Sequence, residues 1–148
     1  MSRVKGNTGA LLLFIGTIII TVSVVLGIIL NLLAIGPACD LAAAAVRDAG
    51  GSADEEALAR TVALVTLVAV VIISTLINLL VIIPGFKYSL QGKCRTWAFV
   101  MAIIGIISVA LSFFNIQGSN LVSVLIDAAG LILYIVGVFM LRSKEKAK

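Results

Sequence analysis

Asp127 is the residue of this 148-residue chain whose type and position most suggest chemistry. It lies in an apolar run at about 121–141, and a charged side chain within hydrocarbon is costly and usually faces protein or water. By depth, Asn31 and Thr66 fall in a similar layer of two other apolar runs. The three side chains predict one intramembrane polar site. It would bind a cation or proton, contact a basic partner helix, or make structural hydrogen bonds, or Asp127 would lie in a hydrated position near the membrane surface.

Other catalytic or binding chemistry has little support in the sequence. The chain has no histidine, so Ser-His-Asp triads, Cys-His pairs and histidine metal sites are excluded. The adjacent acids Asp54, Glu55 and Glu56 would point in different directions around a helix, so their carboxylates do not converge on one site. No phosphate-binding or dinucleotide-binding glycine motif occurs. Cys39 and Cys94 form no paired-cysteine zinc motif. We therefore expect no enzyme activity, no metal and no cofactor.

Four apolar runs must position these residues. Hydrophobic residues make up 61% of the chain and charged residues 12%, so we expect a lipid bilayer to cover much of its surface. About 20 apolar residues cross the hydrocarbon as a helix. We predict an all-α fold, a transmembrane four-helix bundle that forms a single domain over 1–148, with spans at about 9–35, 61–83, 96–115 and 121–141.

The basic residues predict the orientation, because lysine and arginine are enriched on the cytoplasmic side of a membrane. Nine of the eleven basic residues lie at the N-terminus, in the loop 84–95 and in the tail 142–148. The loop 36–60 instead holds five acidic residues and two basic ones. We predict a multi-pass cell-membrane protein with both termini cytoplasmic. The net charge of +4 follows this distribution, and we expect no binding to nucleic acid.

Residues 36–60 predict a short helical extracytoplasmic loop. Pro37 suits the first turn of a helix, and Gly50-Gly51 is expected to end that helix. This loop would connect the first two spans or offer a surface to a partner.

A capping box predicts where the next helix begins. Ser52 precedes Glu55 by three residues, so the helix that contains the second span should begin near Ala53. Pro84-Gly85 is expected to end it at the inner face.

Small residues predict how the helices pack, because close approach through small side chains drives association within lipid. Three spans repeat a small residue every seven positions, a spacing that keeps them on one helix face. These seams are Gly9, Gly16 and Ser23 in the first span, Ala98, Gly105 and Ser112 in the third, and Ser123, Gly130 and Gly137 in the fourth. They would hold the bundle together or join copies of it, and the sequence leaves both open.

Three segments of the second half carry a resemblance to known proteins: Pro84-Gly85-Phe86-Lys87, Met101-Ala102-Ile103-Ile104-Gly105-Ile106-Ile107, and Gly130 to Met140 followed by Arg142. In this pattern the chain resembles small bacterial tetraspan proteins of unknown function. In size and number of spans it also resembles the four-span small multidrug transporters. Those transporters rely on an acidic residue in the first span, whereas Asp127 is in the fourth, and this departure argues against drug–proton exchange.

Two functions follow as alternatives. The first is a non-catalytic integral membrane subunit or scaffold that binds another membrane protein, or copies of itself, through helix faces and the outer loop. The small-residue seams and the lack of catalytic chemistry favour it. The second is a small oligomeric channel or transporter that uses the polar layer around Asp127.

Overall fold

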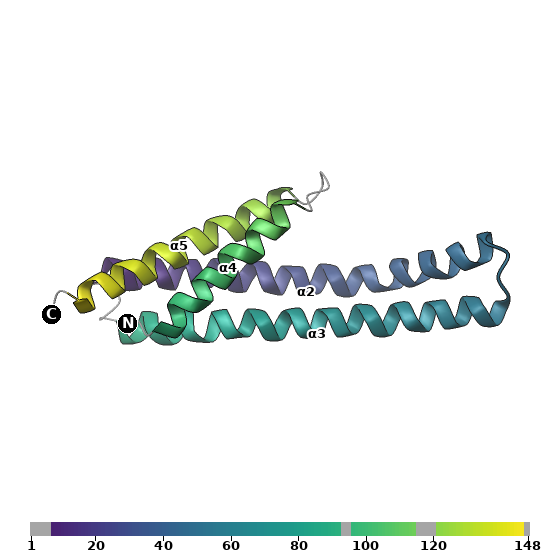
Figure 1. Ribbon diagram of the computed structural model, residues 1–148, viewed down its shortest axis with the longest axis horizontal. Coiled ribbons are helices and arrows are strands. Elements are labelled where there is room, and N and C mark those ends of the chain that lie inside the picture. The colour runs from purple at the N-terminus through teal and green to yellow at the C-terminus, as the bar shows by residue number, and fades with distance from the viewer. Residues whose placement is uncertain (1–6, 93–95, 115–120, 147–148) are drawn as a thin grey trace. The chain divides into compact units, whose positions relative to one another are not determined.

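A computed structural model describes residues 7–92, 96–114 and 121–146, and these residues are almost entirely helical. The helices in chain order are α2 (Thr8–Asp48), α3 (Ala53–Gln91), α4 (Thr96–Phe114) and α5 (Leu121–Lys146), with no strand in the described ranges (Figure 1). Three of them, α2, α3 and α5, are long and apolar enough to cross a membrane. The all-α prediction is confirmed, and these helices have the length and composition of an integral membrane protein.

The chain divides into two compact units, which we describe separately. The first, called the core unit, comprises Met1–Val24 and Asn78–Lys148. The second, called the hairpin unit, comprises Val25–Ile77. The helices α2 and α3 contribute to both units, whereas α4 and α5 belong to the core unit alone.

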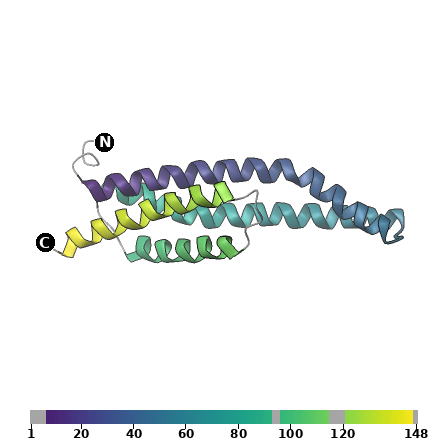
Figure 2. The ribbon, with the colours of Figure 1, turned by 90° about the horizontal axis from the view of Figure 1, so that it is seen from above.

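The core unit is held together by an apolar cluster to which all four helices contribute. Its buried members are Ala10, Leu13, Val81, Tyr88, Met101, Ala102, Tyr134, Val138 and Leu141. Within it, α4 and α5 lie side by side and antiparallel (Figure 2), so that Phe99 meets Phe139 edge to face with ring centroids 5.3 Å apart. The core therefore combines residues that lie far apart in the sequence.

The prediction that α3 ends at Pro84-Gly85 is wrong, because α3 continues beyond them. Pro84 has no N–H to bond the carbonyl of Leu80, which breaks most helices in water. Membrane helices tolerate such an internal proline when they are packed against neighbouring helices. Here this turn of α3 is packed against α5, whose Tyr134 hydroxyl donates a hydrogen bond to the Val81 carbonyl at 3.3 Å.

Gly92 marks the observed end of α3. Its φ of 64° lies in the left-handed region that favours glycine, and its N–H bonds the Tyr88 carbonyl at 2.9 Å. This single bond back into the last turn is a common glycine termination of a helix. The residues that follow, 93–95 with Cys94 among them, lie outside the described residues, as do residues 115–120, which include the connection between the third and fourth predicted spans.

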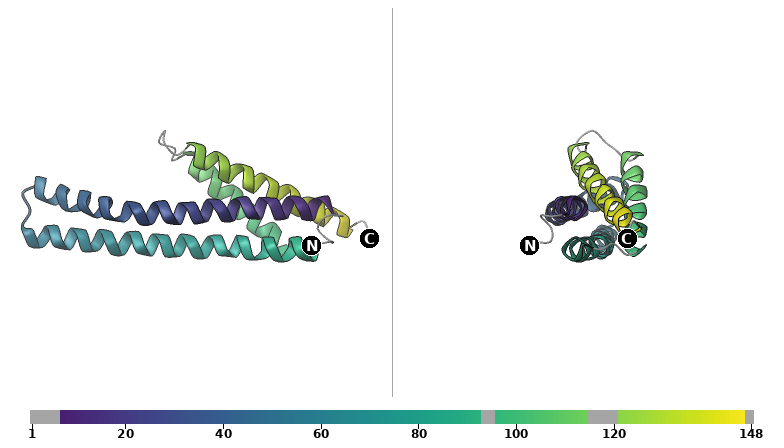
Figure 3. Two further views of the ribbon diagram at one scale, coloured as in Figure 1. Left: turned by 180° about the vertical axis from the view of Figure 1, so that it is seen from behind. Right: turned by 90° about the vertical axis from the view of Figure 1, so that its left-hand side faces the viewer.

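The hairpin unit consists of the adjoining parts of α2 and α3, which run antiparallel and are joined by a turn (Figure 3). The predicted separate helix after Pro37 is not present, because α2 runs without interruption from Thr8 to Asp48. Pro37 instead stands inside the helix, with a high-propensity run of leucine and alanine after it that sustains the helix.

Two glycines end α2 as predicted. Gly50 has φ of 82°, its N–H bonds the Arg47 carbonyl at 2.9 Å, and the N–H of Gly51 bonds the Val46 carbonyl at 2.9 Å. This is the bonding of a Schellman motif, which satisfies the last carbonyls of a helix. The turn therefore closes with little cost in unsatisfied backbone groups.

The capping box at the start of α3 is also confirmed. The Glu55 carboxylate accepts a hydrogen bond from the backbone N–H of Ser52 at 2.7 Å. In return, the Ser52 hydroxyl accepts a hydrogen bond from the N–H of Glu55 at 3.4 Å. These reciprocal bonds satisfy two N–H groups that a helix start leaves free, and α3 begins at Ala53.

Candidate functional site

Asp127 lies on α5 in the core unit, where its side chain is half-buried. Its Oδ1 accepts a hydrogen bond from the hydroxyl of Ser23 on α2. Hydrogen bonds between helices stabilise membrane helix pairs because hydrocarbon offers no competing partner. The candidate site therefore consists of a carboxylate and a hydroxyl that join two helices.

Close packing of α2 against α5 brings this pair together. A methyl group on Gly16 would lie 2.6 Å from the backbone nitrogen of Tyr134 and 2.8 Å from the carbonyl oxygen of Gly130. A methyl group on Gly137 would lie 2.5 Å from the backbone nitrogen of Leu13. At these positions the two backbones touch without an intervening side chain, which only glycine allows.

The first and fourth predicted seams therefore face each other across the α2–α5 interface. Gly9 lies next to Met140, where a methyl group would be 2.8 Å from the Met140 Cβ. Ser23 continues the same face of α2 and reaches Asp127, which is one helical turn from Ser123. In α4, Gly105 packs against the Leu131 side chain of α5. The side chains of Ala98, Ser112 and Ser123 lie outside the described part of the chain.

The other two residues of the predicted polar site belong to the hairpin unit. The Asn31 side chain is exposed and donates to the carbonyl of Gly27 in its own helix at 2.8 Å. Thr66 is exposed. Since Asp127 belongs to the core unit, the clustering of all three residues stays a prediction.

A junction of three helices was missed by the sequence reasoning. Thr17 and Tyr134 are both fully buried, and Gly85 of α3 lies against both. The Thr17 hydroxyl donates to the Leu13 carbonyl at 2.7 Å, so no polar group is left unsatisfied there. The sequence signal that could have indicated this junction is Gly85, which directly follows Pro84 inside an apolar run. A glycine there suits the close approach of another helix as well as a helix end.

The arrangement limits what Asp127 can do chemically. The acidic residues of the core unit are Asp127 and Glu145, and of these two only Asp127 lies within the apolar run 121–141. A carboxylate bonded to a serine can hold two helices together, accept a proton, or bind a cation. With no histidine in the chain, the Ser23–Asp127 pair lacks the base that usually activates a serine.

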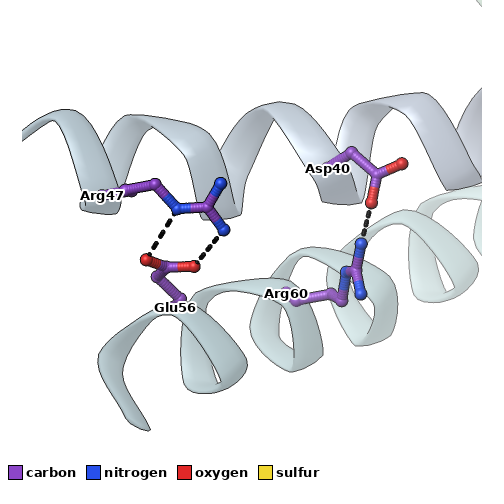
Figure 4. A network of polar contacts seen from close by, with 4 residues as sticks. All are labelled: Asp40, Arg47, Glu56 and Arg60. Atoms are coloured by element: carbon purple, nitrogen blue, oxygen red, sulfur yellow. Dashed lines mark hydrogen bonds and ion pairs between the residues drawn. The ribbon is translucent and has the colours of Figure 1, made fainter. Parts of the chain in front are cut away.

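The tip of the hairpin unit carries a second polar arrangement, two ion pairs between α2 and α3 (Figure 4). The Arg47 guanidinium donates to both oxygens of Glu56, at 3.0 and 2.6 Å. Arg60 bonds Asp40 further along the hairpin. Such pairs favour the antiparallel register of the two helices, although exposed ion pairs add little stability.

Arg47 and Glu56 shift each other's titration. The hydrogen bond from Arg47 and its positive charge lower the pKa of the Glu56 carboxyl below its ordinary value of 4.5. The same bond raises the pKa of the Arg47 guanidinium above its ordinary value. The pair is therefore fully ionised at neutral pH.

The hairpin tip is expected to lose this pair only in acid. A carboxyl whose pKa is lowered on folding stabilises the fold above its unfolded pKa, and this contribution is lost as the pH falls through the folded pKa. For Glu56 that window lies below pH 4.5. NMR titration of the Glu56 side-chain carboxyl carbon should give a pKa below 4.5 in the natural chain. In Arg47→Gln the pKa should return toward the ordinary value, and equal values in both chains would contradict the pair.

Comparison with protein-family models, with curated proteins and with solved structures finds no match to the chain. The helices and their packing therefore carry the evidence on function. The described residues are almost entirely helical and include three helices that are long and apolar enough to cross a membrane.

Proposed function

We propose that the chain is a non-catalytic subunit or scaffold of the cell membrane that crosses the bilayer four times, with both termini cytoplasmic. It would bind another membrane protein, or copies of itself, through its helix faces and the tip of the hairpin unit. The observation that carries this proposal is the large apolar surface that the hairpin unit leaves uncovered.

Two helices cover each other along one face only, so their remaining faces need lipid or other helices. In the hairpin unit, large apolar side chains are exposed on several faces of both helices, for example Val25, Leu26, Ile29, Leu30, Leu32 and Leu33 on α2, and Val62, Val65, Val70, Ile72, Ile73 and Leu76 on α3. Thr75 is one of the polar side chains among them, and its hydroxyl donates to the Val71 carbonyl of its own helix at 2.7 Å. Such a surface suits lipid and apolar helices of a partner.

The lengths of α2 and α3 support a tip outside the hydrocarbon. At 1.5 Å per residue, the 41 residues of α2 would extend over about 60 Å, twice the hydrocarbon thickness. The charged residues of the tip, Arg47 and Glu56 among them, would then lie in water. The apolar helix α4 has 19 residues, which is close to the length that one crossing needs and supports a fourth span.

Site-directed labelling tests the topology. Cys39 and Cys94 would first be changed to serine, and single cysteines introduced by Ala49→Cys at the hairpin tip or Ser143→Cys near the C-terminus. A membrane-impermeant maleimide applied to intact cells should label the first variant and leave the second unlabelled. Equal labelling of both positions, or labelling of Ser143→Cys alone, would overturn the proposed orientation.

Copurification tests the role as a subunit. Two differently tagged copies would be expressed together in native membranes, extracted in a mild detergent and captured through one tag. A scaffold should retain either the second copy or another membrane protein in fixed proportion to the bait. If the chain emerges alone and monomeric, and also conducts ions in liposomes, the scaffold proposal fails.

Asp127 supports a second candidate function, a small channel or transporter, since an acidic residue within an apolar helix often serves transport. Asp127→Asn separates the two functions, because the amide keeps an oxygen that can accept the Ser23 hydrogen bond but removes the charge. For a packing role we expect Asp127→Asn to fold as stably as the natural chain. Asp127→Leu removes the acceptor and should lose about 1 kcal/mol.

Chemical unfolding in mixed micelles and ion flux in liposomes are the two measurements. The packing role predicts no flux from the natural chain or from either variant. Flux from the natural chain that is abolished in Asp127→Asn, with stability unchanged, would establish the transport function instead.

A further inference from the structure

The C-terminal ends of α3 and α5 lie at the same end of the core unit (Figure 1), and each helix carries a basic residue close to it, Lys87 in α3 and Arg142 in α5. By sequence, the N-terminus, residues 84–95 and the tail 142–148 together hold nine of the eleven lysines and arginines and a single acidic residue, Glu145. Basic residues beside an apolar span are complementary to the anionic lipid headgroups of a membrane leaflet.

Arg142 is held in a defined position at this end. Its guanidinium carbon lies 4.7 Å from the centre of the Phe99 ring, and Phe99 in turn meets Phe139 edge to face. A cation–π contact of this kind holds a guanidinium over the ring without using its N–H donors, which can still bond an anion. Within the part of the chain that the structure describes, no carboxylate pairs with Arg142. An ordered set of donors is thus available to an anion.

We propose that Arg142 binds the phosphate of an anionic phospholipid headgroup, with Phe99 holding the guanidinium in place. A planar guanidinium matches two phosphate oxygens at once, and such paired, charge-assisted bonds are among the strongest polar contacts. Arg142 directly follows the predicted span 121–141, at the depth where headgroups lie. The proposal rests on the proposed insertion in the membrane, and the exposed Trp97 nearby in α4 is the residue type that favours this interface.

Native mass spectrometry of the purified full chain in detergent tests the proposal. Phosphatidylglycerol or phosphatidylcholine would be titrated separately and the bound lipid counted. The natural chain should bind phosphatidylglycerol at one site more tightly than phosphatidylcholine. Arg142→Gln should weaken that binding about tenfold, the loss of one charge-assisted contact. Arg142→Lys should weaken it nearly as much, because a lysine cannot form the paired contact or stack in the same way.

Lys87→Gln is the matched control, since it removes one positive charge from the same end of the core unit. Its binding should fall less than twofold, whereas an equal fall in Lys87→Gln and Arg142→Gln would overturn a specific site in favour of a diffuse basic surface. Phe99→Leu should reduce binding about threefold through loss of positioning. Excess inorganic phosphate should not displace the lipid, and displacement would show a site for free phosphate instead.

These measurements use the chain without any partner protein. A failed copurification would therefore leave the lipid site standing, and loss of the lipid preference would leave the scaffold proposal standing. Circular dichroism of each variant confirms that the helices are retained.

Discussion

Gly16→Ala is expected to destabilise the protein by about 3 kcal/mol, the upper end of the usual effect of overpacking. The added methyl group would meet backbone atoms of Tyr134 and Gly130 at 2.6 and 2.8 Å, and backbone in the middle of a packed helix cannot move aside cheaply. The two helices must therefore separate, which also weakens the packing of the apolar cluster around Leu13. The same shift would lengthen the nearby Ser23–Asp127 hydrogen bond.

Gly27→Ala is the matched control for this prediction. Gly27 lies on the same helix, and a methyl group there would have no atom within 4 Å. Both substitutions gain the same helix propensity, about 1 kcal/mol in favour of alanine, so the difference between them isolates the packing cost. Unfolding by denaturing detergent, followed by circular dichroism, measures both. Equal stability of the two variants would mean that α2 and α5 do not touch at Gly16.

The sequence predicted helix starts and ends well where the backbone bonds locally. The capping box of Ser52 and Glu55 and the glycine termination at Gly50 involve residues within six positions of each other, so their outcome depends little on the rest of the fold. Helix type was equally predictable, because long apolar runs in lipid have few alternatives.

The prediction that Pro84-Gly85 ends a helix was wrong because the outcome there depends on contacts between residues far apart in the chain. In water, Pro84-Gly85 would end a helix, and local sequence gives no sign that Tyr134 bonds the carbonyl of Val81 from another helix. Likewise Gly85 serves close packing against Thr17, a contact between residues far apart in the chain. Contacts of this kind follow from the tertiary arrangement, which local propensity does not contain.

The sequence singled out both residues of the candidate site, Asp127 and Ser23, but did not predict the hydrogen bond between them. Asp127 is conspicuous because it interrupts an apolar run, and Ser23 belongs to a regular seven-residue seam. Their hydrogen bond depends on the antiparallel register of α2 and α5, which the facing glycines of both seams determine. Depth within the membrane suggests Asn31 and Thr66 as further neighbours of Asp127, and that clustering stays a prediction.

Tyr134→Ala is expected to cost about 3–5 kcal/mol, since Tyr134 is fully buried between three helices and its removal leaves a cavity. Tyr134→Phe keeps the ring and removes the hydroxyl that donates to the Val81 carbonyl, so it should cost about 1 kcal/mol. Ile132→Ala serves as the control on the same helix, because Ile132 is 59% exposed, and should change stability by less than about 0.5 kcal/mol.

The order of these three variants distinguishes packing from hydrogen bonding as the main role of Tyr134. A cost for Tyr134→Phe close to that of Tyr134→Ala would mean that the hydroxyl matters more than the volume of the ring. If volume dominates, as we expect, the junction of Thr17, Gly85 and Tyr134 stabilises the core unit through its shape.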